Sequence, residues 1–331
     1  MTYAEQPGAV EPPAAQRPGL PYHLIQTAGL PGWWRPVAGT FALVATLLVV
    51  VPVLLQVPFA IGYAVAGDPV ADSLVRLTDL DDPTPLGLAY LNLALAAAIP
   101  VTWLLLRVLH GLPPRWLASV RPRIRWGWFL TCLAISVVGL LATLVVSAFV
   151  PSQGEGTELS GHVNDFTATT RDFALVVLLL TPLQAAGEEY CFRGYLAQAF
   201  GGLFRSRWAA VLVPSVLFAL AHGSQSAPVF LDRFAFGLVA GTLAILTGGL
   251  EAGIAMHVLN NWLAFGLALA YGDMATTLNP SGGTWWSIPV TLTQSLVYLG
   301  LVLLAARRRG LRTTTSQPWG PGVLEPPRPR V

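Results

Sequence analysis

The chain has 331 residues, of which 54% are hydrophobic and only 11% are charged. Soluble globular proteins carry about 25% charged residues, so this composition argues against a soluble enzyme. The formal net charge is +2, and the basic residues stand at the ends of apolar runs rather than in one stripe, which argues against a nucleic-acid-binding protein.

The two ends of the chain are rich in proline and lack long apolar runs. Residues 1–36 do not show the basic start followed closely by an apolar stretch that marks a cleaved signal peptide. We therefore expect this segment to be a disordered or surface-lying tail. We expect the same of residues 307–331, which begin with a basic cluster and continue with several prolines. The part between them, 37–306, is predicted to be one transmembrane domain.

Eight apolar segments lie between the two tails. A bilayer core of about 30 Å needs about 20 residues of helix, and most of these segments reach that length. The fifth and sixth are short or interrupted. The pattern predicts an all-α polytopic membrane protein with about eight transmembrane helices, at roughly 37–60, 86–108, 126–150, 172–200, 206–222, 228–247, 250–271 and 286–306.

The arginines indicate how these helices are oriented. All 19 basic residues are arginine, and they concentrate after the second and the last apolar segments. The connections after the first and the third segments are acidic instead. Because basic connections tend to stay on the cytoplasmic side, we expect both termini in the cytoplasm. The expected location is the plasma membrane of a bacterium, with the lipid bilayer itself as a partner.

Ionisable and amide side chains inside the predicted spans gather in the second half of the chain. Such groups are costly in lipid and usually face a cavity or a partner. This asymmetry predicts a polar site in the core 172–271, with the earlier segments as scaffold. The fourth, fifth and seventh segments supply the candidate residues, which are Glu188, Glu189, Arg193, His222, His257 and Asn261.

Helical spacing divides these residues by role. Glu189 and Arg193 are four residues apart with the acid first, which is the favourable order for an ion pair, so we assign them a supporting structural role. Glu188 lies about 100° around the helix and has no such partner in sequence, which suits a general base or acid. His257 and Asn261 share one helix face, and the amide of Asn261 suits an oxyanion.

Each motif also has a simpler interpretation when it is taken alone. Two adjacent glutamates usually mark a solvated helix end, and a histidine at the end of a span is usually an interfacial residue. The pair His257 and Asn261 could be a hydrogen-bond clamp between helices. The joint occurrence of all three motifs in a charge-poor chain favours a catalytic site.

These motifs resemble, in the same order, those of the CPBP family, also called the Abi or type II CAAX-protease family. The family pattern is EExxxR, FxxxH and HxxxN, and the corresponding segments here are EEYCFR (188–193), FALAH (218–222) and HVLNN (257–261). The resemblance covers about 172–271 and implies an eight-helix intramembrane endopeptidase. It further implies that Glu188 and His222 activate a water, and that His257 and Asn261 hold the oxyanion of the tetrahedral intermediate.

Members of this family are often called metalloproteases, which raises the question of zinc. The sequence has no HExxH motif. Glu188, His222 and His257 could nevertheless form a zinc site with two histidines, one glutamate and an open position. We favour a glutamate-dependent mechanism without a metal, and zinc is the alternative.

Glu188 and His222 meet only under a geometric condition. The fourth helix must be long, about 172–200, and the fifth must reach only mid-depth by residue 222. We then expect a water-filled cavity reached from the cytoplasm and a membrane-associated peptide or protein as substrate. Two other functions use the same polar set, namely a non-catalytic immunity or assembly factor and a small proton-coupled transporter. A proton relay does not need the amide of Asn261, so this residue is the feature that distinguishes a peptidase from a transporter.

Overall fold

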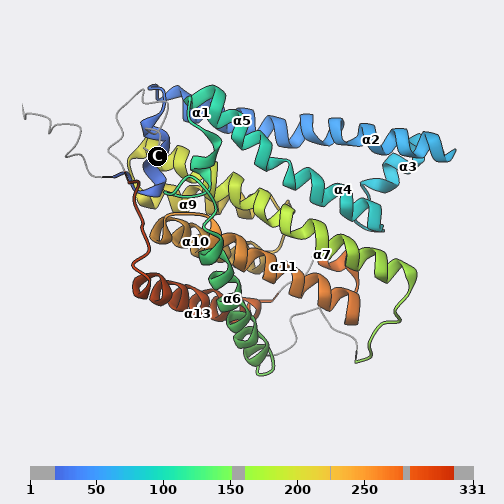
Figure 1. Cartoon of the computed structure of the whole chain (residues 1–331). Helices are drawn as coiled ribbons and strands as arrows, with labels where there is room; N and C mark the ends of the chain where they lie inside the picture. The colour runs from blue at the N-terminus through green and yellow to red at the C-terminus, as the bar shows by residue number, and fades with distance from the viewer. Residues whose placement is uncertain (1–18, 151–160, 224, 279–283, 317–331) are drawn as a thin grey trace, which may run out of the picture.

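The computed structural model describes residues 19–150, 161–223, 225–278 and 284–316 (Figure 1). In these ranges the chain folds into helices and connections, with no strand beyond two isolated bridges. The all-α polytopic membrane bundle expected from the apolar segments is therefore confirmed.

Among the described residues, seven helical stretches are long and apolar enough to cross a membrane. Several of them join consecutive elements, since α1 (Trp34–Ala45), η3 (Thr46–Val50) and α2 (Val51–Ala66) run on as one helix, and so do α4 (Pro85–Ala96) and α5 (Ala98–His110). The seven stretches are Trp34–Ala66, Pro85–His110, Trp126–Ser147 (α6), Ala168–Phe204, Ala227–Thr247 (α10), Glu251–Tyr271 (α11) and Ser287–Arg308 (α13).

The fifth predicted segment is an apolar helix that is too short to cross. This helix, α9 (Arg207–Leu220), has 14 residues. At a rise of 1.5 Å per residue it is about 21 Å long, less than the bilayer core of about 30 Å. The stretch before it is unusually long, because α7 (Ala168–Glu189), η5 (Tyr190–Leu196) and α8 (Ala197–Phe204) form one helix of 37 residues. The long fourth helix and the short fifth helix that would bring residues 188 and 222 together are thus both present.

The predicted N-terminal tail 1–36 is wrong in its second half. Residues 1–18 lie outside the described residues, but η2 (Tyr22–Ala28) is a 3-10 helix packed into the core, and α1 already begins at Trp34. The side chain of Tyr22 is fully buried, and its hydroxyl donates a hydrogen bond to the carbonyl oxygen of Leu117. The apolar face of this segment is short and surrounded by prolines, so it does not stand out in the sequence. The composition therefore suggests a tail.

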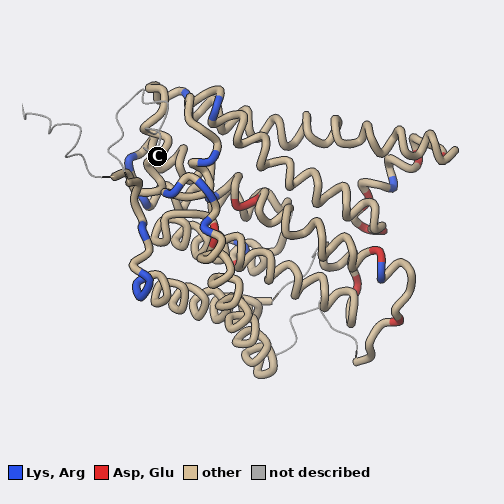
Figure 2. Tube along the Cα trace, in the orientation of Figure 1, with Lys and Arg blue, Asp and Glu red and all other residues tan. Residues whose placement is uncertain are grey.

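The two terminal segments are joined at one end of the bundle. The backbone N–H of Leu20 donates to the hydroxyl of Thr315 at 2.9 Å, and Thr315 is buried. Residues 317–331 of the predicted C-terminal tail lie outside the described residues. Most arginines lie at this same end, whereas the acidic connections lie mainly at the opposite end (Figure 2). In the orientation predicted from the arginines, the first of these ends faces the cytoplasm.

Candidate active site

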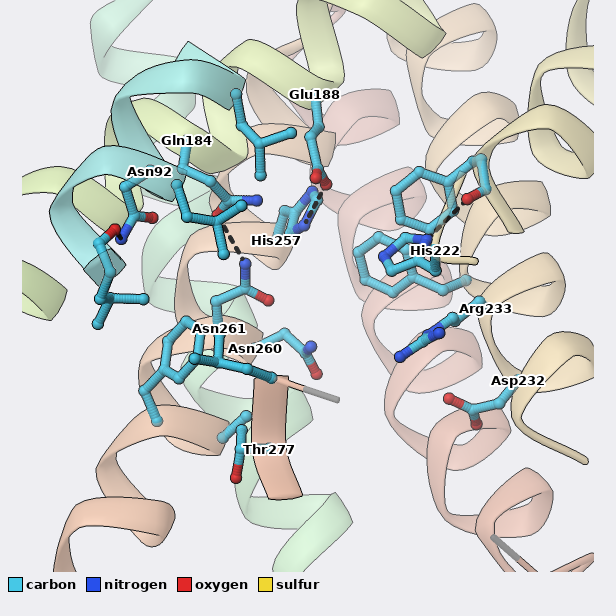
Figure 3. A pocket seen from close by; sticks show the side chains of 18 of the residues that line it. Asn92, Gln184, Glu188, His222, Asp232, Arg233, His257, Asn260, Asn261 and Thr277 are labelled. Atoms are coloured by element: carbon cyan, nitrogen blue, oxygen red, sulfur yellow. Dashed lines mark hydrogen bonds and ion pairs between the residues drawn. The ribbon is translucent and has the colours of Figure 1, made fainter. Parts of the chain in front are cut away.

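A cavity of about 290 Å³ lies in the half of the bundle formed by the later helices (Figure 3). The four predicted catalytic residues come from different elements, yet all of them line this one cavity. They come from α7, from the turn after α9 and from α11. These residues and their polar neighbours in the lining are Glu188, His222, His257, Asn261, Asn92, Gln184, Asp232, Arg233, Asn260, Thr277 and Thr291.

Glu188 and Glu189 stand at a change in the helix that carries them. They are the last residues of α7, and the next seven residues form the π-helical η5. Such widened turns frequently occur at functional sites. Just before them, Gly187 packs against α4, where an added Cβ would lie only 2.3 Å from the carbonyl oxygen of Leu95. The glycine therefore permits the close approach that sets α7 against its neighbour at the level of the cavity.

Glu189 is buried and holds two partners from two helices. Its Oε1 accepts a hydrogen bond from Nη1 of Arg193 at 2.9 Å and another from Nδ1 of His257 at 3.0 Å. The guanidinium of Arg193 also stacks on the ring of Phe218, 4.3 Å from its centroid. Burying a charge pair is favourable only with such additional contacts. These contacts fix the imidazole of His257 with a proton on Nδ1.

The second ring nitrogen of His257 faces the cavity. Its Nε2 lies 3.3 Å from Oε2 of Glu188, and the side chain of Glu188 is 12% exposed. His257 therefore lies between two carboxylates, Glu189 on the buried side and Glu188 on the cavity side. The contact with Glu189 is not predicted by the sequence, because it depends on how α7 packs against α11. The only hint of this contact in the sequence is that two acidic residues, Glu188 and Glu189, stand next to each other.

His222 lies on the opposite wall of the cavity from Glu188 and His257 (Figure 3). Its Nδ1 is 2.7 Å from the carbonyl oxygen of Phe218, so this nitrogen donates and Nε2 is left as an acceptor. The ring of Phe218 packs edge-on against both histidines, with ring centroids 4.7 Å from His222 and 6.0 Å from His257. The phenylalanine of the FALAH segment thus contacts both imidazoles.

Asn261 is positioned by a residue that the motifs do not include. Its Nδ2 donates to Oε1 of Gln184 at 3.0 Å. Gln184 precedes Glu188 by one helical turn, so this spacing was a usable signal for a second polar residue on the cavity face. Asp232 and Arg233, which are not among the candidate residues taken from the motifs, also line the cavity.

The alternative zinc set does not form in the described part of the chain. No three side chains of His, Cys, Asp or Glu gather there in an arrangement that could hold a metal ion. Glu188 and His257 face each other, but His222 remains on the other wall. These residues do not fit a three-ligand zinc site, and we derive no step through a metal.

The cavity extends toward the acidic end of the bundle. Its lining from α11 runs from His257 to Phe265, away from the first residue of that helix. Further lining comes from the end of α12 (Met274–Leu278) and from the first turns of α13. The arginine-rich end is covered by η2 and by η4 (Pro114–Leu117). The expected access from the cytoplasm and the expected cytoplasmic position of the arginine-rich end therefore do not agree with each other.

Comparisons with known proteins agree with the motifs. Residues 170–263 match the model of the family described as type II CAAX prenyl endopeptidase Rce1-like. An uncharacterised protein of Bacillus subtilis, YyaK, is 24% identical over 287 residues, which cover 81% of this chain and 86% of the relative. No solved structure matches the chain at a significant level. The segment that carries all three motifs coincides with the family match, so the predicted resemblance to the CPBP family of membrane endopeptidases is confirmed.

Proposed function

We propose that the protein is an intramembrane endopeptidase that hydrolyses a peptide bond in a membrane-associated peptide or protein. The observation that carries this proposal is the cavity in which Glu188 faces a histidine held by a buried acid–arginine pair. The match of residues 170–263 to a family of endopeptidases supports the same conclusion. Hydrolysis within a bilayer requires water in a polar hollow, which this cavity provides.

Glu188 acts as the general base in this proposal. It takes a proton from a water molecule while the oxygen of that water forms a bond to the carbonyl carbon of the substrate. His222 orients the water from the opposite wall, because its Nε2 is free to accept a hydrogen bond. When the carbon–nitrogen bond breaks, the proton held by Glu188 passes to the leaving nitrogen. The products are one carboxylic acid and one amine.

His257 and Asn261 stabilise the negative oxygen of the tetrahedral intermediate. Nδ1 of His257 donates to Glu189, so Nε2 carries a hydrogen only when the imidazole is positively charged. In that form Nε2–H donates to Glu188 before the attack and to the oxyanion after it. Asn261 donates one amide hydrogen to Gln184 and keeps the other for the oxyanion. Glu189 and Arg193 position the histidine and do not touch the substrate.

Replacing Glu188 by glutamine tests this assignment. Without a base, cleavage of a fluorogenic peptide by the purified protein in detergent should fall by about a hundredfold or more. His222→Ala should also reduce cleavage, whereas Asp172→Asn offers a matched control, because Asp172 is half-exposed and is not among the residues that line this cavity. Activity equal to wild type in both Glu188→Gln and His222→Ala would remove the peptidase assignment and favour the immunity-factor or transporter alternatives.

The same assay tests the mechanism without a metal. We expect the wild-type protein to keep its activity after treatment with a chelator, with less than one equivalent of zinc bound by elemental analysis. A loss of activity on chelation that added zinc restores would show instead that the cavity recruits a metal ion.

A further inference from the structure

Arg233 brings a positive charge into the cavity without forming a close ion pair with any described acid. Within the described part of the chain, no carboxylate oxygen lies within 4.0 Å of its guanidinium. Its Nη1 donates to Oε1 of Gln225 at 2.7 Å, and Gln225 in turn donates to the carbonyl oxygen of Ala219 at 2.6 Å. An unpaired charge within a membrane helix is costly, and it typically marks a functional site.

Asp232 and Glu188 attract this charge, but neither carboxylate contacts the guanidinium. Asp232 is adjacent in sequence, so its side chain leaves the helix about 100° away from that of Arg233. Oδ1 of Asp232 is buried without a hydrogen bond, which shows that it does not reach the guanidinium. Arg233 is thus held in place by the neutral amide of Gln225, and its guanidinium makes no direct contact with a carboxylate of the described residues.

The guanidinium is aimed at the space that a substrate would occupy. In Figure 3, Arg233 points into the cavity from the same wall as His222, and Asn260 lies opposite. A guanidinium has five N–H donors in a planar fork, which matches the two oxygens of a carboxylate. Gln225 accepts from one nitrogen, so most of this fork is available to a ligand.

We propose that Arg233 binds a carboxylate of the substrate peptide, on the far side of His222 from Glu188. This inference rests on the proposed function, since it names the class of peptide that the site takes. The cavity of about 290 Å³ is small for a binding pocket and holds only a short stretch of peptide. The carboxylate comes from a free C-terminus or from an aspartate or glutamate side chain close to the cleaved bond.

A binding experiment separates these sources without requiring cleavage. The probes are three hexapeptide libraries of neutral residues with an N-terminal dodecanoyl anchor. One library ends in a free acid, one in a carboxamide, and one in a carboxamide with a single internal glutamate. Binding is measured by thermophoresis with the Glu188→Gln protein in phosphatidylcholine nanodiscs. We expect the free-acid or the glutamate library to bind at least about tenfold more tightly than the neutral amide library.

Variants of Arg233 show whether this preference depends on the guanidinium. Arg233→Gln should reduce the ratio of acid to amide affinity to about one. Arg233→Lys should restore part of it, because lysine keeps the charge but not the fork. The exposed Arg308 on α13 serves as the matched control, and Arg308→Gln should keep the full preference. Thermal unfolding of each variant checks that the fold is retained.

Three results would overturn the proposal: equal affinity for all libraries, binding of none, or an acid preference that survives Arg233→Gln. Failure of the proposed function looks different. If Arg233→Gln removes the preference but protein with Glu188 intact cleaves no library, the carboxylate site stands and the peptidase assignment falls.

Discussion

At Gly253 the absence of a side chain determines whether Glu189 can reach His257. Gly253 lies one turn before His257 on α11, and an added Cβ would stand 2.5 Å from Oε2 of Glu189. That carboxylate cannot easily move aside, because Arg193 and His257 both hold its other oxygen. We expect Gly253→Ala to displace the carboxylate, to reduce peptide cleavage at least about tenfold, and to lower the free energy of unfolding by about 1–3 kcal/mol.

The same helix provides the control for this substitution. At Gly266 no atom lies within 4 Å of the position that an added Cβ would take, so Gly266→Ala should leave cleavage unchanged and stabilise the helix slightly. Activity and thermal unfolding of the two variants are compared in detergent. Equal losses in both would mean that α11 tolerates no added volume at all, and that the contact with Glu189 is not the reason.

Contacts within one helix could be predicted from the sequence, whereas contacts between helices could not. The ion pair of Glu189 with Arg193 follows from a spacing of four residues, and it is present at 2.9 Å. The bridge from Glu189 to His257 joins residues 68 positions apart, so it depends on the packing of α7 against α11. The charge of Arg233 in the cavity was likewise hidden, because its helix looks apolar apart from two adjacent polar residues.

Among the elements, long apolar helices were predictable and short buried ones were not. The segment expected at 228–247 is the helix Ala227–Thr247, and the one expected at 250–271 is Glu251–Tyr271. Apolar run length determines such helices directly. In contrast, η2 depends on long-range contacts at Leu117 and Thr315, and the π-helical η5 depends on its surroundings in the bundle. Neither leaves a periodic pattern in the sequence.

A buried ion pair at the arginine-rich end connects three elements, α6, α10 and α11. Nη2 of Arg125, just before α6, lies 2.6 Å from Oε2 of Glu251, the first residue of α11. Nη1 of Arg125 also donates to the carbonyl oxygen of Thr247 at the end of α10. Removing one partner leaves the other charge buried and alone. We therefore expect Arg125→Met to lower the free energy of unfolding by about 3–5 kcal/mol, measured by thermal unfolding in detergent.

A double variant separates charge from packing at this place. Replacing Arg125 by methionine and Glu251 by leucine removes both charges together, so most of the lost stability should return. A double variant as unstable as Arg125→Met would show instead that the hydrogen bonds to backbone carbonyls, rather than the uncompensated carboxylate, account for the loss.

For the whole molecule, the positions of the arginines and of the cavity together determine from which side a substrate enters. Most arginines lie at the end where the two terminal segments meet, and the cavity extends toward the opposite, acidic end. If basic connections stay in the cytoplasm, water and substrate reach Glu188 from the outer half of the membrane. Peptides that arrive there have been translocated or lie in the outer leaflet.

Thiol labelling of intact bacterial cells that express variants with one added cysteine tests this orientation. The two native cysteines, Cys132 and Cys191, are buried and should give little background. We expect Thr277→Cys, which replaces a residue of the cavity lining, to react with a membrane-impermeant maleimide in intact cells. Arg312→Cys, at an exposed position of the arginine-rich end, should react only after the cells are permeabilised. The reverse pattern would place the cavity toward the cytoplasm and would mean that the arginine distribution does not determine the orientation of this chain.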